Sequence, residues 1–247
     1  LTRREFVNLG AAAAAVTASP LGRAGAQEVA CVHWAARAAA DMPEPDLPAL
    51  LLSRAAFGAR PGDVERARRI GPGAWIEEQL DHTAIDDSAV ETPLRQTLPS
   101  LSMTPGQLLT TYDKKQGELI AELRAATLYR MVYSPRLLYE VMVEFWSDHF
   151  NIYHLANLCR TFKTIDDRDV IRAHALGRFK DLLTASARSP AMLHFLDNDV
   201  NRRGRPNENY GREIMELHTL GVAADGVPYT EEDIKNVALC FTGWGWD

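Results

Sequence analysis

The last forty-one residues of the chain, NENYGREIMELHTLGVAADGVPYTEEDIKNVALCFTGWGWD (Asn207–Asp247), predict two helices together with their ends. The first runs over about 207–220 and stops at Gly221, since glycine readily adopts the left-handed conformation that ends a helix. The second begins after Thr230, which forms a capping box with Asp233, although Asp replaces the usual Glu or Gln. Two helices joined by a loop are therefore expected here.

The first of these helices carries a carboxylate among apolar side chains. At about 100° per residue, one face gathers an apolar arc that includes Glu213, with His218 at its edge. The arc consists of Tyr210, Ile214, Leu217 and Leu220. On another face Glu208, Arg212 and Glu216 follow one another at the i, i+4 spacing of solvated ion pairs.

The role of Glu213 and His218 depends on whether their side chains are buried. A buried carboxylate needs a partner or a raised pKa, so both residues are candidates for acid–base chemistry or ligand binding. The structural alternative is that Glu213 pairs with an arginine or caps another helix, and that His218 is a half-buried histidine with its hydrogen bonds satisfied.

Four blocks of the sequence resemble a known family. NENYGREIMELHTLGV and YTEEDIKNVALCFTGW are similar to the signature of the exported bacterial family catalogued as domain of unknown function 1800, and so is FWSDHFN (Phe145–Asn151). SPAMLHFLDN (Ser189–Asn198) resembles a fourth block, with Ser189 where the family usually has His. The resemblance covers about residues 50–246 and implies a mostly helical, exported protein that continues beyond Asp247. It implies no reaction.

The N-terminus has the three parts of a secretory signal in order. Arg3 and Arg4 are followed by the apolar segment Leu9–Leu21 and by an A-x-A cleavage site at Ala24–Ala26. These features predict a twin-arginine signal over residues 1–26, a linker over 27–46, and a periplasmic or extracellular location. The apolar segment is too short to span a membrane, and no later segment reaches about 18 apolar residues.

Charge and cysteine content exclude some classes of protein. The chain has 27 Lys and Arg against 33 Asp and Glu, a net charge of −6. Such a balance argues against nucleic-acid binding, which needs a basic face. The three cysteines, Cys31, Cys159 and Cys240, leave at least one thiol without a partner in this chain.

Residues 47–247 predict an all-α domain, because no stretch shows the alternation of a half-buried strand. We expect nine or ten helices around a central apolar helix at 136–150, which packs against 207–220, with 230–241 covering both. The prolines of Asp86–Ser102 predict a surface loop there, and a long helix is expected from Thr104 to Val132.

The central helix 136–150 is apolar nearly all round, with a narrow polar stripe that includes Glu140 and Glu144. His149 lies on the apolar side of this helix. It is a third candidate for a ligand or a general base, although a lone histidine on an apolar face is usually a structural one.

The loop Asp197–Glu208 has the spacing of a calcium loop. Acids or amides stand at positions 1, 3 and 5 and a glutamate at position 12, with a backbone carbonyl expected at position 7. The ligands would be Asp197, Asp199, Asn201, Arg203 and Glu208. However, Arg202 occupies position 6, where the loop needs glycine. The alternative is an ion-paired turn in which the arginines neutralise the carboxylates and Asn207 caps the next helix.

Two classes of function follow. The favoured one is an exported binding or assembly protein whose partner is an unidentified protein or small molecule. The alternative is a hydrolase that uses Glu213, His218 or His149 as acid–base groups. No nucleophile elbow, H-E-x-x-H or phosphate loop occurs in the sequence, so no motif names a reaction.

Overall fold

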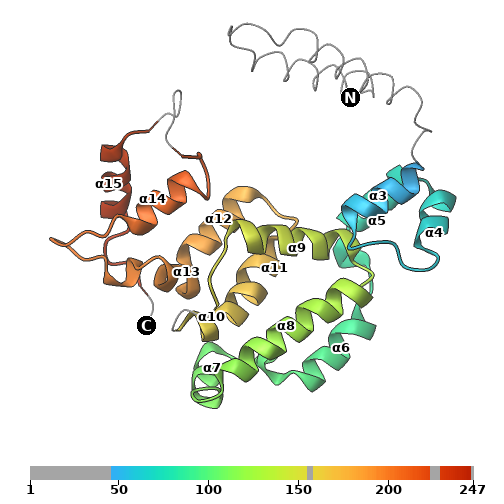
Figure 1. Cartoon of the computed structure of the whole chain (residues 1–247), viewed down its shortest axis with the longest axis horizontal. Coiled ribbons are helices and arrows are strands. Elements are labelled where there is room, and N and C mark those ends of the chain that lie inside the picture. The colour runs from blue at the N-terminus through green and yellow to red at the C-terminus, as the bar shows by residue number, and fades with distance from the viewer. Residues whose placement is uncertain (1–45, 155–157, 223–228, 246–247) are drawn as a thin grey trace, which may run out of the picture. The chain divides into compact units, whose positions relative to one another are not determined.

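The computed structural model describes residues 46–154, 158–222 and 229–245 (Figure 1). All the described helices belong to the unit of residues 47–247. In these ranges there is no strand, only a single bridge between Arg202 and Arg205. The all-α fold predicted from the sequence is confirmed.

The helices are short, and there are more of them than the nine or ten predicted. Their bounds are α3 Leu47–Ala55, α4 Asp63–Ile70, α5 Pro72–Leu80, α6 Ser88–Thr97, α7 Pro105–Thr111, α8 Gln116–Tyr133, α9 Leu137–His149, α10 Cys159–Asp166, α11 Arg172–His174, α12 Phe179–Arg188, α13 Pro190–Phe195, α14 Asn209–Glu216 and α15 Glu231–Cys240. Single 3₁₀ turns lie at η1 His82–Ala84, η2 Pro99–Ser102 and η4 Asn198–Val200.

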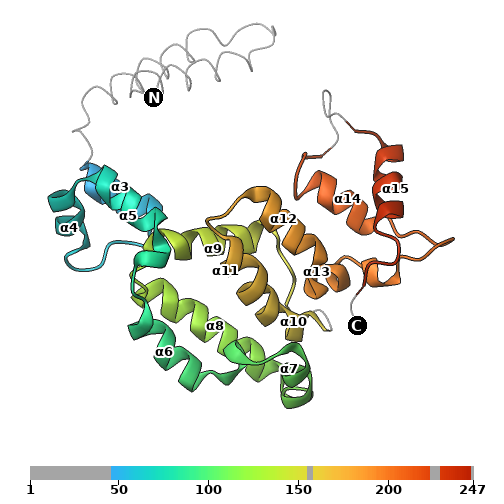
Figure 2. The same cartoon turned by 180° about the vertical axis from the view of Figure 1, so that it is seen from behind.

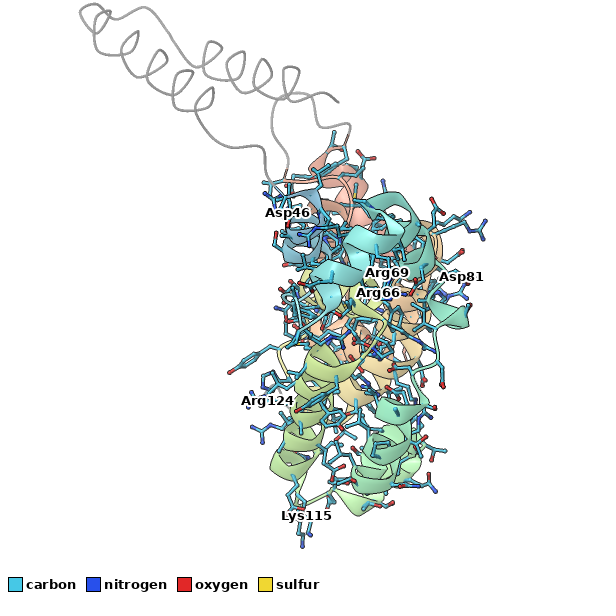
Figure 3. The ribbon with its side chains drawn as sticks, turned by 90° about the vertical axis from the view of Figure 1, so that its right-hand side faces the viewer. Asp46, Arg66, Arg69, Asp81, Lys115 and Arg124 are labelled. Atoms are coloured by element: carbon cyan, nitrogen blue, oxygen red, sulfur yellow. The ribbon has the colours of Figure 1, made fainter. Side chains whose placement is uncertain are left out.

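Three boundaries differ from the prediction. The predicted loop 86–102 contains α6, which holds Pro93 in its interior because Val90 and Leu94 are buried on its inner face. The predicted helix from Thr104 to Val132 is broken into α7 and α8, and Lys115 just before α8 and Arg124 within it point outward (Figure 3). The predicted helix 207–220 ends at Glu216.

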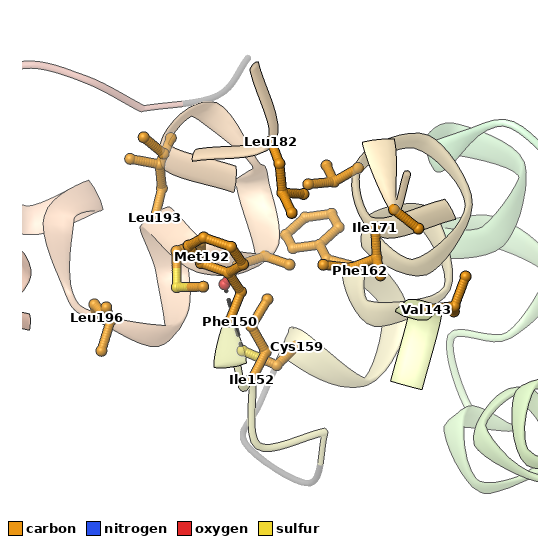
Figure 4. Close-up of a cluster of buried hydrophobic side chains, with 14 of the residues drawn as sticks. Val143, Phe150, Ile152, Cys159, Phe162, Ile171, Leu182, Met192, Leu193 and Leu196 are labelled. Carbon is orange, nitrogen blue, oxygen red and sulfur yellow. Dashed lines mark hydrogen bonds between the residues drawn. The ribbon is translucent and has the colours of Figure 1, made fainter. Parts of the chain in front are cut away.

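The main hydrophobic core lies among α9, α10, α12 and α13 (Figure 4). Phe150, Ile171 and Met192 are completely buried in it, and the Cys159 thiol points at the Ala191 carbonyl, 3.9 Å away. Helix α10 packs against α7, α8 and α13. It is therefore α10, rather than the predicted central helix, around which this part of the chain is arranged.

Helix α9 matches its predicted position but not its predicted environment. It contacts α3, α5 and α8, and its apolar surface is partly exposed, since Phe145 is 54% accessible. Conversely Glu140, predicted on the solvated stripe, is only 4% accessible and forms an ion pair with Arg172 at 2.6 Å. Sequence periodicity finds the helix, but the partner on another helix decides which face is buried.

One wide turn interrupts the helical run after α10. Residues Asp167–Ile171 form a π-helical turn, η3, which continues directly into α11. Such turns are rare and occur frequently at functional sites. This turn places Asp167 and Arg172 on the side of α10 that faces α6 and α8, as the cavity described below shows.

Helices α14 and α15 pack closely against each other (Figure 2). Gly211 makes this approach possible, because a Cβ there would lie 3.0 Å from the Ile234 carbonyl oxygen. The capping box predicted for Thr230 and Asp233 is present with both of its hydrogen bonds. Two buried asparagines, Asn198 and Asn201, fasten the end of α15 to the loop before α14.

Candidate functional site

A cavity of about 230 Å³ opens between α6, α8, α10 and η3. Ten of its twelve lining residues are polar or charged. The walls are made by Asp87, Glu91, Arg95, Leu101, Arg130, Arg136, Tyr139, Thr164, Asp167, Arg168, Arg172 and Ala173. The volume lies just below the range of about 300–1,000 Å³ that is usual for drug-sized ligands, so the cavity suits a smaller molecule.

Three residues of this cavity carry buried polar atoms without a hydrogen-bond partner in the described protein. They are Asp87 Oδ1, Arg130 Nη1 and Thr164 Oγ1, on residues that are 4%, 5% and 1% accessible. Native proteins satisfy the large majority of buried polar groups, so each exception needs an explanation. Here three exceptions from three different helical segments face one cavity, which points to a molecule that completes them.

Asp167 also lines the cavity, although its oxygens are not among the fully buried, unpartnered atoms. Its side chain is 7% accessible and lines both this cavity and a second one of about 240 Å³ between α8 and α9. No side-chain hydrogen bond or salt bridge of Asp167 occurs within the described residues, although its neighbour Asp166 has two, from Lys163 at 3.2 Å and from Ser189 at 2.8 Å. The charge of Arg172 acts on this carboxylate, but its oxygens accept no side-chain hydrogen bond there, so they remain available to a ligand.

The rest of the wall is held by ion pairs. Arg130 donates to both oxygens of Glu91, at 2.6 and 3.0 Å. Burial raises the pKa of Glu91, but the hydrogen bond and charge of Arg130 outweigh it and leave that pKa below its usual value. Arg172 lies over the Tyr139 ring at 5.3 Å. Burial by itself would lower the pKa of Arg172, but the charges of Asp167 and Glu140 outweigh this effect. The pKa of Arg172 therefore lies above its usual value, and the guanidinium stays charged.

The charges of the site balance. Five arginines and three carboxylates line the cavity. Two further carboxylates, Glu140 and Asp169, pair from outside with Arg172 and Arg168. The sum is five positive and five negative charges. Desolvation raises the pKa of Asp87 although Ser134 donates a hydrogen bond to its Oδ2 at 3.1 Å. A neutral or zwitterionic ligand fits this balance better than a highly charged one.

The chain contributes the wall from segments far apart in the sequence. Ser134 follows α8, and its hydroxyl joins Asp87 to the backbone N–H of Arg136. Arg136 then donates two hydrogen bonds to the Ile85 carbonyl. These links fix the start of α6 against the start of α9.

Two of the three predicted catalytic candidates meet elsewhere in the structure. The His149 and His218 rings are 6.3 Å apart, and His149 Nε2 lies 3.0 Å from the His218 carbonyl oxygen. His218 is buried, and desolvation together with His149 lowers its pKa to about 4. The rings of Phe150 and Phe179 pack around the pair. His218 is therefore neutral at physiological pH.

Glu213 does not join the two histidines through its side chain. It is half-buried, and only its backbone carbonyl takes part in the local structure, by accepting the His218 N–H at 3.0 Å. The predicted apolar arc is buried only in its first half: Tyr210 is 1% accessible and Ile214 packs against the core, whereas Leu217 and Leu220 are 58% and 50% accessible. The helix ends before both residues, which turns them towards solvent.

The predicted calcium ligands are engaged in other contacts. Asp199 pairs with His194 at 2.8 Å, and Glu208 lies 3.7 Å from Arg212. The side-chain amide of Asn201 donates a hydrogen bond to the Ala238 carbonyl at 2.8 Å. Asp197 and Arg203 are exposed. Within the described residues no three His, Cys, Asp or Glu side chains could hold one metal ion. The calcium site stays a prediction.

The ion-paired alternative for this loop also differs from the structure. Arg202, Arg203 and Arg205 are exposed, and no salt bridge joins them to the described carboxylates. The loop is held instead by asparagines. Asn207 does act near the helix start, accepting the Asn209 N–H at 3.0 Å.

Sequence reasoning missed the cavity because its parts lie in segments with other interpretations. The α6 segment was expected to be a loop. Spacing alone does not show that Arg130 and Arg172, forty-two positions apart, line the same cavity. No local signal in the sequence could have brought them together.

Comparison with known proteins gives one match. Residues 50–247 match the model of the family described as protein of unknown function, DUF1800. The chain belongs to the DUF1800 family. No curated protein and no solved structure matches it. Membership confirms the resemblance stated from the sequence. Among the described residues, no helix has the length and apolar character needed to cross a membrane.

Proposed function

We propose that this DUF1800 protein is an exported binding protein and that its ligand is a small molecule held in the cavity between α6, α8, α10 and η3. The observation that carries the proposal is the convergence of three buried, unpartnered polar atoms on that cavity. A partly satisfied buried polar network is unfavourable unless something completes it.

The unpartnered atoms define what the ligand offers. Arg130 Nη1 is a donor, so it needs an oxygen acceptor, and the other two nitrogens of that guanidinium already bind Glu91. Nη1 keeps both of its N–H groups, and because Glu91 already holds the Nε and Nη2 edge of the guanidinium, one or two separate hydroxyl or carbonyl oxygens suit it better than a bidentate carboxylate. Asp87 Oδ1 and Asp167 need donors, which hydroxyl or amino groups supply. We therefore infer a small polyhydroxyl or amino-bearing molecule, neutral or zwitterionic.

The test uses Thr164→Val, which keeps the shape of the side chain and removes one orphan hydroxyl. Its matched control is Ser186→Ala, because Ser186 Oγ is also buried and unpartnered but does not line the cavity. Sugars, polyols, amino acids and hydroxy acids are screened by thermal shift. A true ligand at about 100 times its Kd adds roughly 2.7 kcal/mol, or about 5–11 °C for a domain of this size.

We expect the unliganded Thr164→Val and Ser186→Ala proteins to be as stable as the wild type or more stable, since each loses an unsatisfied buried group. Only Thr164→Val should lose the ligand-induced shift. Water alone can also fill a polar cavity. If no compound of these classes shifts the wild-type melting temperature, the cavity is a hydrated structural feature and the proposal is wrong.

Export is the second part of the proposal, and it rests on the sequence. Residues 1–26, which carry the twin-arginine pattern, lie outside the described residues. Replacing Arg3 and Arg4 by lysine should retain the protein in the cytoplasm, because recognition of such a signal depends on the pair. Undiminished accumulation of this variant in the periplasm would remove the twin-arginine assignment.

A further inference from the structure

Three arginines crowd the tip of the loop between α13 and α14. Arg202, Arg203 and Arg205 surround Gly204 and are all exposed. This loop extends away from the neighbouring helices in both views (Figures 1 and 2). Of the nearest carboxylates along the chain, Asp199 pairs with His194, and Glu208 lies 3.7 Å from Arg212. No described carboxylate forms a salt bridge with the three arginines.

The turn that carries them is fixed by its backbone. The Arg202 N–H donates to the Arg205 carbonyl at 3.3 Å, and the Arg205 N–H donates to the Arg202 carbonyl at 2.9 Å. Gly204 has a φ of 80°, a left-handed conformation that glycine adopts without strain. We name residues 202–205 the arginine turn.

The base of the arginine turn is equally constrained. Asn201 is 1% accessible and donates to the Ala238 carbonyl at 2.8 Å. Asn207 donates to the Asp197 carbonyl at 3.3 Å. A surface that is already ordered loses little conformational entropy when a partner binds.

An open groove of about 760 Å³ lies beside the turn. It is lined by Val200, Arg202, Arg205, Pro206, Asn207 and Glu208. Val200 is 56% accessible, so the groove offers apolar contact next to two guanidinium groups. This combination suits an extended peptide segment with acidic side chains.

We infer that the arginine turn and its groove are a docking surface for a carboxylate-rich segment of a protein partner. The guanidinium fork matches carboxylate geometry and gives short, charge-assisted hydrogen bonds. The chain as a whole carries a net charge of −6, so an extended polyanion such as a nucleic acid or an anionic bilayer meets repulsion from the rest of the molecule. A short acidic segment touches only the turn.

The experiment measures the fluorescence anisotropy of a labelled peptide of alternating glutamate and serine, with a glutamine-for-glutamate peptide as its reference. The wild-type chain should bind the acidic peptide saturably. Arg202→Ala/Arg203→Ala/Arg205→Ala should weaken binding about tenfold, since three exposed ion pairs are lost. Raising the salt from about 0.01 M to about 0.15 M should weaken wild-type binding too, as the Debye length falls from about 30 Å to about 8 Å.

The matched control removes the same number of exposed positive charges elsewhere, as Arg54→Ala/Arg69→Ala/Lys114→Ala. It should bind like the wild type. Because the arginine turn is closed by hydrogen bonds between backbone atoms, its triple alanine variant should have the same Tm as the wild type. Equal loss of binding in both triple variants overturns the proposal, as does binding of duplex DNA or phosphatidylglycerol vesicles without binding of the peptide.

Discussion

Replacing Asn201 by alanine should cost this domain about 3–5 kcal/mol of stability, although Asn201 lies in a loop. The Asn201 amide donates to the Ala238 carbonyl at 2.8 Å and to Asn198 Oδ1 at 3.2 Å, and it accepts the Asn207 N–H at 3.0 Å. A typical hydrogen bond contributes about 1 kcal/mol, and each buried partner left unpaired costs about 1–3 kcal/mol. Asn201 is 1% accessible, so water does not readily replace it.

Thermal unfolding at neutral pH measures this effect. For a domain of this size about 1 kcal/mol corresponds to 2–4 °C, so the expected fall in Tm is about 6–20 °C. The control is Asn236→Ala, which removes an exposed asparagine of α15 and should change stability by no more than about 0.5 kcal/mol. If Asn201→Ala and Asn236→Ala have the same Tm, the hydrogen bonds of Asn201 do not stabilise the loop and the reasoning is refuted.

The same assay tests the calcium prediction for Asp197–Glu208. A calcium loop predicts that millimolar calcium raises the Tm of the wild type by several degrees over chelator-treated protein, and that Glu208→Gln abolishes the rise. The contacts of Asp199 and Asn201 predict no calcium response. A rise that depends on Glu208 would show that these side chains rearrange around an ion.

Three further results are expected. Burial lowers the pKa of His218 to about 4, so below pH 6.5 the unfolded chain takes up a proton that the folded chain does not. The free energy of unfolding should therefore be highest above pH 6.5 and fall between pH 6.5 and 4 by on the order of 2–3 kcal/mol. Melting curves of His218→Gln should lack this part of the pH dependence. A maleimide should label Cys240, which is exposed, and spare Cys159 until the protein unfolds, as peptide mapping would show, because burial raises the pKa of Cys159 to about 11. Glu213→Gln and Glu216→Gln should each change Tm by less than about 4 °C, since Glu216 has only a half-exposed pair with Arg212, and a much larger fall for Glu213→Gln alone would restore its predicted burial.

Local sequence signals predicted the helices well where the decisive contacts are also local. The capping box of Thr230 and Asp233 was found, because cap residues act within one turn. The prediction was wrong where a distant contact overrides a local preference. Pro93 favours a loop, but the buried faces of α6 and the Glu91–Arg130 pair keep the segment helical.

The candidate site was less predictable than the fold. His149 and His218 were named from their positions in apolar patterns, and the structure brings them together. The cavity was not predicted, because its unpartnered atoms on Asp87, Arg130 and Thr164 become recognisable only when their surroundings are known. The burial of Glu140 was not predicted either, because it depends on the ion pair with Arg172, which comes from another helix.

The π turn at Asp167–Ile171 makes the binding wall depend on chain register as well as on residue identity. The turn holds one residue more than an α-helical turn, and each residue rotates a helix by about 100°. Asp166 can therefore face Lys163 and Ser189, while Arg172 reaches Glu140 on the other side. Deletion of a single codon within 169–171 would close the wide turn to an ordinary α-helical one, which keeps Arg172 in its present direction and changes the direction of the side chains inside the turn. Asp167 and Arg168, which line the cavity from inside this turn, could thus be redirected with both residues still encoded in the gene.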